Sequence, residues 1–181
     1  ILAGAFIGFG GLGNTIASQT FAGIDPGVAK LIGAAVFPVG LMLVVICGAE
    51  LFTGNNLMTL ALMNNKITGG QMVKNWCVVW VGNLVGSIAL ALIVFYGDVL
   101  TGDAATKAIA IAEGKAGLDI MTMILRGILC NILVVLAVWM ATSAQDIISK
   151  IFSCWFPIML FVLCGFEHSV ANMYFIPIGM L

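Results

Sequence analysis

The sequence predicts an all-α membrane protein built as an inverted three-helix repeat with two broken helices. Hydrophobic residues make up 62% of the 181 positions and charged residues only 8%, whereas an average soluble domain carries about 25% charged residues. Long apolar stretches occupy most of the chain, each able to cover the hydrocarbon core with about 20 helical residues. A nine-residue pattern containing a carboxylate occurs twice. We therefore expect one transmembrane channel domain over residues 1–181 that lies in a lipid bilayer.

The apolar segments follow one another with short connections. Segment one covers residues 1–19 and is rich in glycine, which in lipid allows helices to approach closely. Segment two begins after the helix-start signal Asp25-Pro26 and ends at Glu50. The remaining predicted segments cover residues 55–63, which are too short to span alone, 73–96 with Gly82 and Gly86 at small-xxx-small spacing, 118–143, 151–165, and a short continuation from Asn172 to Pro177.

Lysines in the short connections predict the orientation in the membrane. The connection between the second and third spans carries Lys66 and Lys74, and the one between the fourth and fifth carries Lys150. Positively charged loops remain on the cytoplasmic side. We expect those two connections in the cytoplasm, the connection 97–117 on the opposite side, and a multi-pass location in the plasma membrane or a bacterial inner membrane.

Several classes of function find no support in the composition. The net charge is −1 and there is no basic tail, so nucleic acid is not an expected partner. The five cysteines lie in apolar segments without metal-ligand spacing, which favours small core residues over ligands or disulfides. A single histidine, no Cys/His cluster and no seryl nucleophile motif argue against an enzyme or a haem carrier. We expect no metal and no cofactor.

The repeated pattern identifies the two broken helices. Residues 47–55 align without gaps on residues 164–172, and the copies share Cys, Gly, Glu and Asn at a separation of 117 positions. Because three apolar segments intervene, the second copy enters the membrane from the opposite side, as in inverted-repeat transporters. We expect a first repeat over 1–97, a partial second repeat over 117–181, truncation at both ends, and a sixth span beyond Leu181.

The breaks predict a path for a small anion. Free backbone groups inside lipid are tolerated only where protein or a water-filled cavity satisfies them. Half-helix N-termini carry partial positive charge, which suits an anion or the carbonyl oxygen of a small acid. Glu50 and Glu167 are expected to bind backbone amides and hydroxyls of the loops rather than transfer protons, and with Asn55 and Asn172 they form the broken-helix support.

Three further polar residues are candidates for the pore wall. His168 is the only histidine and sits in one break, where we favour a pore-facing donor over a packing histidine. Thr53 occupies the other break and offers a hydroxyl from the opposite wall. Asn131 stands alone among apolar residues and is either an interhelical tie or a third pore contact.

Three separated motifs resemble the formate/nitrite transporter family. They are ELFTGN at 50–55, RGILCN at 126–131 and FEHSVANMYFIP at 166–177, with KNWCVVWVGNLVGS at 74–87 between the first two. The resemblance covers essentially the whole chain. It implies an aquaporin-like six-helix protomer, a homopentamer with one pore per subunit, and a monovalent anion such as formate, nitrite or hydrosulfide as the solute.

The same resemblance implies roles for individual residues. The family's central histidine falls on His168, its mobile-loop threonine on Thr53, its pore asparagine on Asn131 and its vestibule lysine on Lys115. Apolar constrictions around the histidine are implied for Phe37, Leu41, Leu51, Phe52, Val134 and Phe161.

The expected mechanism is proton-linked passage through these constrictions. Lys115 concentrates anions, His168 supplies or stabilises a proton with Thr53 or Asn131 as its partner, and the neutral acid passes the phenylalanines. One alternative is a hydrogen-bonding channel that passes the charged anion. Another is an aquaporin-type pore for neutral solutes, but Asn55 is followed by Asn56 and Asn172 by Met173, so the paired Asn-Pro-Ala motifs are missing.

Overall fold

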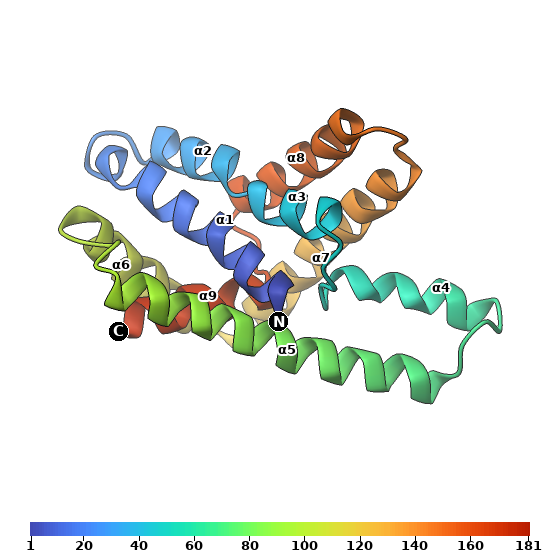
Figure 1. The fold of residues 1–181 in the computed structure, drawn as a ribbon. Coiled ribbons are helices and arrows are strands. Elements are labelled where there is room, and N and C mark those ends of the chain that lie inside the picture. Colours follow the sequence, from blue (N-terminus) through green and yellow to red (C-terminus); the bar gives the residue numbers. More distant parts are fainter.

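The computed structural model describes the backbone of residues 1–181 and the side chains of all of these residues except Ala22. The chain is helical throughout (Figure 1). The α-helices are α1 (Leu2–Ser18), α2 (Pro26–Val36), α3 (Val39–Ile46), α4 (Met58–Met63), α5 (Gly69–Tyr96), α6 (Asp103–Ala116), α7 (Ile120–Ser143), α8 (Ile147–Cys164) and α9 (Ser169–Met180), and two 3-10 turns are η1 (Thr20–Gly23) and η2 (Gly54–Leu57).

Long apolar helices confirm the predicted membrane fold. In the part of the chain that the structure describes, four helices are long and apolar enough to cross a bilayer, namely α2 with α3, α5, α7 and α8. Their outer faces are apolar: the side chains of Ile124, Leu125 and Ile128 on α7 are each more than half exposed. Such a surface suits lipid and not water.

The two interrupted segments run in opposite directions. From the end of the molecule that carries the α1–α2 turn, α2, α3 and α4 lead toward the α4–α5 turn (Figure 1). From the α7–α8 turn, α8 and α9 lead back toward α6, where the chain ends beside that helix (Figure 1). This arrangement agrees with the predicted inverted repeat, while the repeat boundaries at 1–97 and 117–181 stay a prediction.

Side chains stabilise the N-termini of α2 and α5, and the first of these caps is the predicted helix start at Asp25-Pro26. Asp25 accepts hydrogen bonds from the backbone N–H groups of Gly27 and Val28, at 2.8 and 3.1 Å, and Pro26 occupies the first turn. Thr68 and Gln71 form a reciprocal capping box at the start of α5. These caps fix where the spans begin.

Glycines let α1 pack against its neighbours at backbone distance. A Cβ on Gly4 would collide with the backbone carbonyl of Asn83 on α5, and one on Gly10 would lie 2.5 Å from the carbonyl oxygen of Phe37. Gly86 on α5 is equally close to the backbone of Ile1. The close approach expected from small residues is therefore confirmed, and it brings α1 against both α5 and the bend that joins α2 to α3 at Pro38.

Three expectations need correction. The connection 97–117 contains α6, which packs on α9. A Cβ on Gly179 of α9 would lie 2.4 Å from the Cβ of Ala112 and 2.8 Å from the carbonyl oxygen of Ala108, so only a glycine fits there. The continuation of the fifth segment runs through Pro177 to Met180. Of the five cysteines, Cys130 and Cys154 are buried, whereas Cys47, Cys77 and Cys164 are exposed.

Substitution of Gly4 by valine should separate α1 from α5. Overpacking of this kind costs about 1 to 3 kcal/mol, so we expect Gly4→Val to lower the thermal midpoint of the purified full-length protein in detergent by several degrees. The matched control is Gly69→Val, since no atom lies within 4 Å of a Cβ at Gly69. Equal midpoints for the two variants would contradict this packing.

Candidate functional site

The first break follows α3. Gly48 adopts φ +73°, a left-handed conformation that favours glycine, and the Ala49 N–H donates to the carbonyl of Val44 at 2.9 Å. These are the features of a Schellman motif, which ends a helix and satisfies its free carbonyls. The extended chain then reaches Thr53 before η2 begins at Gly54.

The second break repeats this geometry. Gly165 adopts φ +72°, and the Phe166 N–H donates to the carbonyl of Phe161 at 3.0 Å. Each of these positions lies 117 residues after its counterpart in the first break. The shared glycine of the repeated pattern is therefore explained by helix termination, because both copies need a left-handed residue at the same place.

The shared glutamate and asparagine pair with each other in both breaks. Glu50 Oε2 accepts from Asn55 Nδ2 at 3.1 Å, and Glu167 Oε2 accepts from Asn172 Nδ2 at 2.8 Å. Asn75 Nδ2 also donates to Glu50 Oε2 at 3.1 Å. The sequence predicted backbone amides and hydroxyls as partners, and the partners are side-chain amides instead. Each pair connects the loop of its break to the helical turn that follows.

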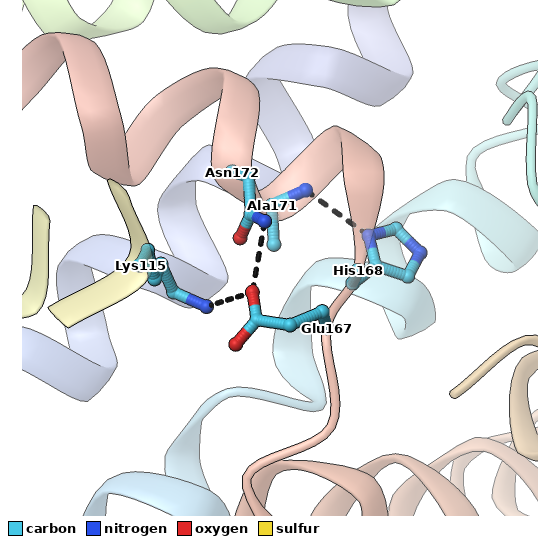
Figure 2. A network of polar contacts seen from close by, with 5 residues as sticks. All are labelled: Lys115, Glu167, His168, Ala171 and Asn172. Carbon is cyan, nitrogen blue, oxygen red and sulfur yellow. Dashed lines mark hydrogen bonds and ion pairs between the residues drawn. The ribbon is translucent and has the colours of Figure 1, made fainter. Parts of the chain in front are cut away.

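Lys115 forms an ion pair with the second glutamate. Its Nζ lies 2.8 Å from Glu167 Oε2, and the two side chains are 17% and 9% exposed. Figure 2 shows the carboxylate between the ammonium group and the amide of Asn172. The ammonium also lies 5.4 Å from the ring centroid of Phe175. Lys115 is on α6 and not in a loop, and its charge is largely neutralised by Glu167.

His168 joins the two breaks. Its Nε2 lies 2.8 Å from Thr53 Oγ1, and its Nδ1 accepts from the backbone N–H of Ala171 at 3.0 Å, so that the ring caps α9 (Figure 2). The side chains of Thr53 and His168 are buried, at 0% and 3% exposure. The structure thus brings together the two polar residues that the sequence placed on opposite walls.

The cap on α9 determines the tautomer of His168. A nitrogen that accepts a hydrogen bond carries no proton, so the proton of the neutral ring is on Nε2. Nε2–H then donates to Thr53 Oγ1, which leaves the Thr53 hydroxyl proton free for another acceptor. A second proton on Nδ1 would remove the bond from Ala171. The geometry therefore favours a neutral histidine.

Two aromatic rings pack beside His168 in the wall of a cavity. Phe37 meets Phe161 edge to face at 5.7 Å between centroids, and Phe161 stacks on His168 at 5.8 Å. These three rings line one end of a cavity of about 420 Å³, which we call the vestibule, and Lys115 lies in its wall. Leu41, Leu51 and Val134 are buried in the same core without lining the vestibule, and the partly buried Phe52 packs against them.

Asn131 makes one of the two contacts predicted for it. Its Oδ1 accepts from Asn56 Nδ2 at 3.1 Å, and its own Nδ2 donates to the carbonyl of Gly127 at 3.2 Å. This hydrogen bond ties α7 to η2 beyond the first break. Asn131 lines a separate pocket, with Asn56 and other residues of α7, and not the vestibule.

Sequence reasoning missed Asn83, which supports the first break from α5. Its Oδ1 accepts from the Phe52 N–H at 2.9 Å, and its Nδ2 donates to the Glu50 carbonyl at 3.0 Å. The side chain is fully buried. It satisfies the backbone on one side of Thr53 and so positions that residue. A lone amide in the middle of an apolar span was the available signal.

Removal of the Asn83 amide should loosen the first break. In Asn83→Leu the Phe52 N–H and the Glu50 carbonyl lose their partners, at about 1 to 3 kcal/mol for each buried unsatisfied group. We expect faster hydrogen–deuterium exchange in a peptide that covers residues 47–57. Asn64→Leu is the control, because Asn64 is exposed and bonds only within its own helix end. Unchanged exchange in Asn83→Leu would disprove the positioning role.

The tautomer of His168 can be measured directly. Solid-state NMR of protein labelled with ¹⁵N-histidine at pH 7 should give a neutral ring with the proton on Nε2, since Nδ1 accepts from Ala171. Because His168 is the single histidine of these residues, a His168→Gln sample identifies its signal. A proton on Nδ1, or a doubly protonated ring, would be incompatible with the described cap.

Comparison with known proteins gives the family. The family model "Formate/nitrite transporter" matches residues 1–181. The chain is 46% identical over 198 residues to a probable formate transporter of Methanothermobacter thermautotrophicus, with 99% of this chain and 72% of that protein covered. It is 40% identical to the formate channel FocA of Escherichia coli K12, covering 100% of this chain and 65% of FocA. The nitrite transporter NirC of the same strain is 35% identical, with 95% and 63% covered.

Solved structures agree with these sequence matches. A pentameric formate channel with formate bound superimposes with a TM-score of 0.90 at 35% identity, covering 98% of this chain and 71% of that one. An FNT family ion channel gives a TM-score of 0.91 at the same identity. The chain spans 65% of the length of FocA and 63% of that of NirC. From the broken helices, the motifs and these matches, we conclude that the chain is a multi-pass membrane protein of the formate/nitrite transporter family.

Proposed function

We propose that this chain forms a pore for the small monovalent anion of a weak acid, with formate, nitrite and hydrosulfide as the candidate solutes. The observation that carries the proposal is the 2.8 Å contact between Thr53 and His168, which places two hydrogen-bonding side chains where the breaks meet. The relatives named as formate channels and a nitrite transporter support the choice of solutes.

The proposed path begins in the vestibule. The solute passes Lys115, moves between Phe37 and Phe161, and reaches the pair of Thr53 and His168. Beyond that pair it meets a second apolar constriction formed by Leu41, Leu51, Phe52 and Val134. Since these side chains are in contact, passage requires them to move apart.

Energetics favour the neutral acid as the species that crosses the constrictions. An idealised bare anion in an apolar medium pays about 20 kcal/mol of desolvation. Protonating an acid with a pKa of about 3.9 at pH 7 costs only about 4 kcal/mol. A solute that takes up a proton in the vestibule and crosses as the acid therefore avoids most of the barrier.

In this proposal His168 stabilises the protonated solute and does not supply its proton. Because Nδ1 is committed to Ala171, loss of the Nε2 proton would leave an imidazolate anion. When the solute arrives, the Nε2–H exchanges its bond to Thr53 Oγ1 for one to the solute, and both it and the Thr53 hydroxyl can donate hydrogen bonds to a carboxyl or nitrite oxygen. The proton then comes from water, and the central pair replaces hydrogen bonds that the solute loses on leaving the vestibule.

The remaining site residues have supporting roles in the proposal. Glu50 with Asn55 and Glu167 with Asn172 hold the breaks in shape. Asn131 fixes η2 against α7 and so sets the position of the first break. We further propose a homopentamer with one pore per subunit, on the strength of the pentameric formate channel that superimposes on this chain.

A channel that passes the charged anion is the second candidate, because a neutral His168 is compatible with it. Coupled proton movement separates the two mechanisms: the neutral-acid route acidifies the vesicle lumen in step with solute uptake, and the charged route does not. An aquaporin-type pore is disfavoured by the family match and by the missing Asn-Pro-Ala motifs.

Flux measurements test the proposed function. Uptake of formate, nitrite and hydrosulfide by the full-length protein in proteoliposomes is measured side by side. We expect uptake of at least one solute with concurrent proton movement. His168→Phe removes the Nε2–H and Thr53→Val the hydroxyl, and each should lower flux at least about tenfold.

The control for these two variants is Thr59→Val, because Thr59 lies on α4 and its exposed hydroxyl bonds only the nearby carbonyl of Asn56. If the wild-type protein carries none of the three solutes, the proposed function is refuted. Unchanged rate and pH dependence in His168→Phe would instead refute only the role of the central pair.

A further inference from the structure

The bend between α2 and α3 carries one ring of the first constriction. Pro38 is fully buried and has no N–H, so the carbonyl one turn earlier, that of Ala34, has no intrahelical donor. Backbone bonding resumes with the Gly40 N–H, which donates to the carbonyl of Phe37 at 3.1 Å. The helical ladder is thus interrupted at this bend, and Phe37 is the residue directly before the proline.

Trp155 on α8 supplies a hydrogen-bond donor to the bend. Its Nε1–H donates to the carbonyl of Ala35, 120 positions away, at 3.1 Å. Among the described residues no backbone N–H donates to that carbonyl. Inside a membrane water cannot replace a missing donor, so a proline bend is tolerated where a neighbouring helix satisfies the freed groups. We propose that Trp155 is a positioning residue for the constriction, because its indole holds the bend in the shape that presents Phe37 to Phe161. This inference rests on the proposed function.

Both sides of this constriction depend on α8, which lies against α2 and α3 (Figure 1). Phe161 follows Trp155 by six positions on the same helix, about 9 Å along its axis. The ring of Phe161 meets that of Phe37 edge to face, with 5.7 Å between centroids. The indole bond therefore fixes the bend relative to the helix that carries the opposing ring. Without this bond, Phe37 is free to move away from Phe161.

A second tryptophan holds the other end of the pore-lining segment in the same way. Trp76 on α5 donates its Nε1–H to the carbonyl of Asn55 at 3.0 Å. Residues 37–53, which contain every candidate pore residue of the first repeat, lie between the two acceptor carbonyls. Trp80 and Trp139 are 40% and 53% exposed, and neither donates a hydrogen bond within the part of the chain that the structure describes. These two tryptophans are therefore matched controls.

The bond from Trp155 should determine which solutes pass the constriction. Acetate is larger than formate by one methyl group, and an apolar site discriminates against an added group of this size by its fit. A mobile Phe37 gives acetate the room that it lacks, whereas the smaller formate gains little. General destabilisation of the protein lowers both uptake rates together. The ratio of acetate to formate uptake is therefore a readout that a merely structural role of Trp155 does not change.

The test replaces Trp155 in the full-length protein, in phosphatidylcholine vesicles, by phenylalanine and by benzothienylalanine. The second replacement exchanges the indole N–H for sulfur at nearly the same shape, so the packing of the ring is kept. Both should raise the ratio of acetate to formate uptake at least about threefold, the factor expected for one lost hydrogen bond. Trp139→Phe is the matched control and should leave the ratio unchanged.

Hydrogen–deuterium exchange tests the same bond without transport. A peptide that covers residues 33–42 should exchange faster in both Trp155 variants and not in Trp76→Phe, in which faster exchange should appear at residues 54–63 instead. An unchanged uptake ratio in the benzothienylalanine protein, unchanged exchange at 33–42, or an equal rise of the ratio in Trp139→Phe would overturn the positioning role. If the wild-type protein carries none of formate, nitrite and hydrosulfide, the proposed function fails, while the exchange measurement still decides whether Trp155 holds the bend.

Discussion

Backbone groups freed inside a membrane must find partners, and this constraint governs both broken helices. A helix that stops in lipid exposes N–H and C=O groups that cost several kcal/mol each if unpaired. Here a left-handed glycine turns the chain back on its own carbonyls at Gly48 and again at Gly165. Asn83 then pairs with the first loop, and the His168 ring accepts an N–H at the start of α9. The groups that make the breaks possible also position the polar site.

The two breaks share a scaffold but differ in chemistry. Termination by glycine and the Glu–Asn pair occur in both copies. The position of His168 in the second copy is held by Leu51 in the first, so only one break contributes an imidazole. The second glutamate is also nearly buried and paired with Lys115, whereas Glu50 is exposed and bonds asparagine amides. The vestibule and the ion pair of Lys115 with Glu167 therefore lie at the second break.

The ion pair between Lys115 and Glu167 divides the vestibule into two kinds of cation. A partly buried pair keeps its partners fixed, because breaking it would leave an uncompensated charge. The neutralised lysine helps to hold the second break beside His168. Lys30 and Arg126 also line the vestibule, and among the described side chains they form no ion pair within 4 Å.

The sequence by itself determined the apolar spans and the positions of the two breaks. These features depend on local composition and on a nine-residue pattern, and such local patterns can be recognised without knowing the tertiary structure. Only the tertiary structure decided that His168 meets Thr53, 115 positions away, and that Lys115 meets Glu167. It also revealed α6 and the pairing of Asn83 with the first loop. Contacts between distant segments depend on how helices pack and rotate, and the hydrophobic pattern of a membrane span, apolar on nearly every face, does not encode that rotation.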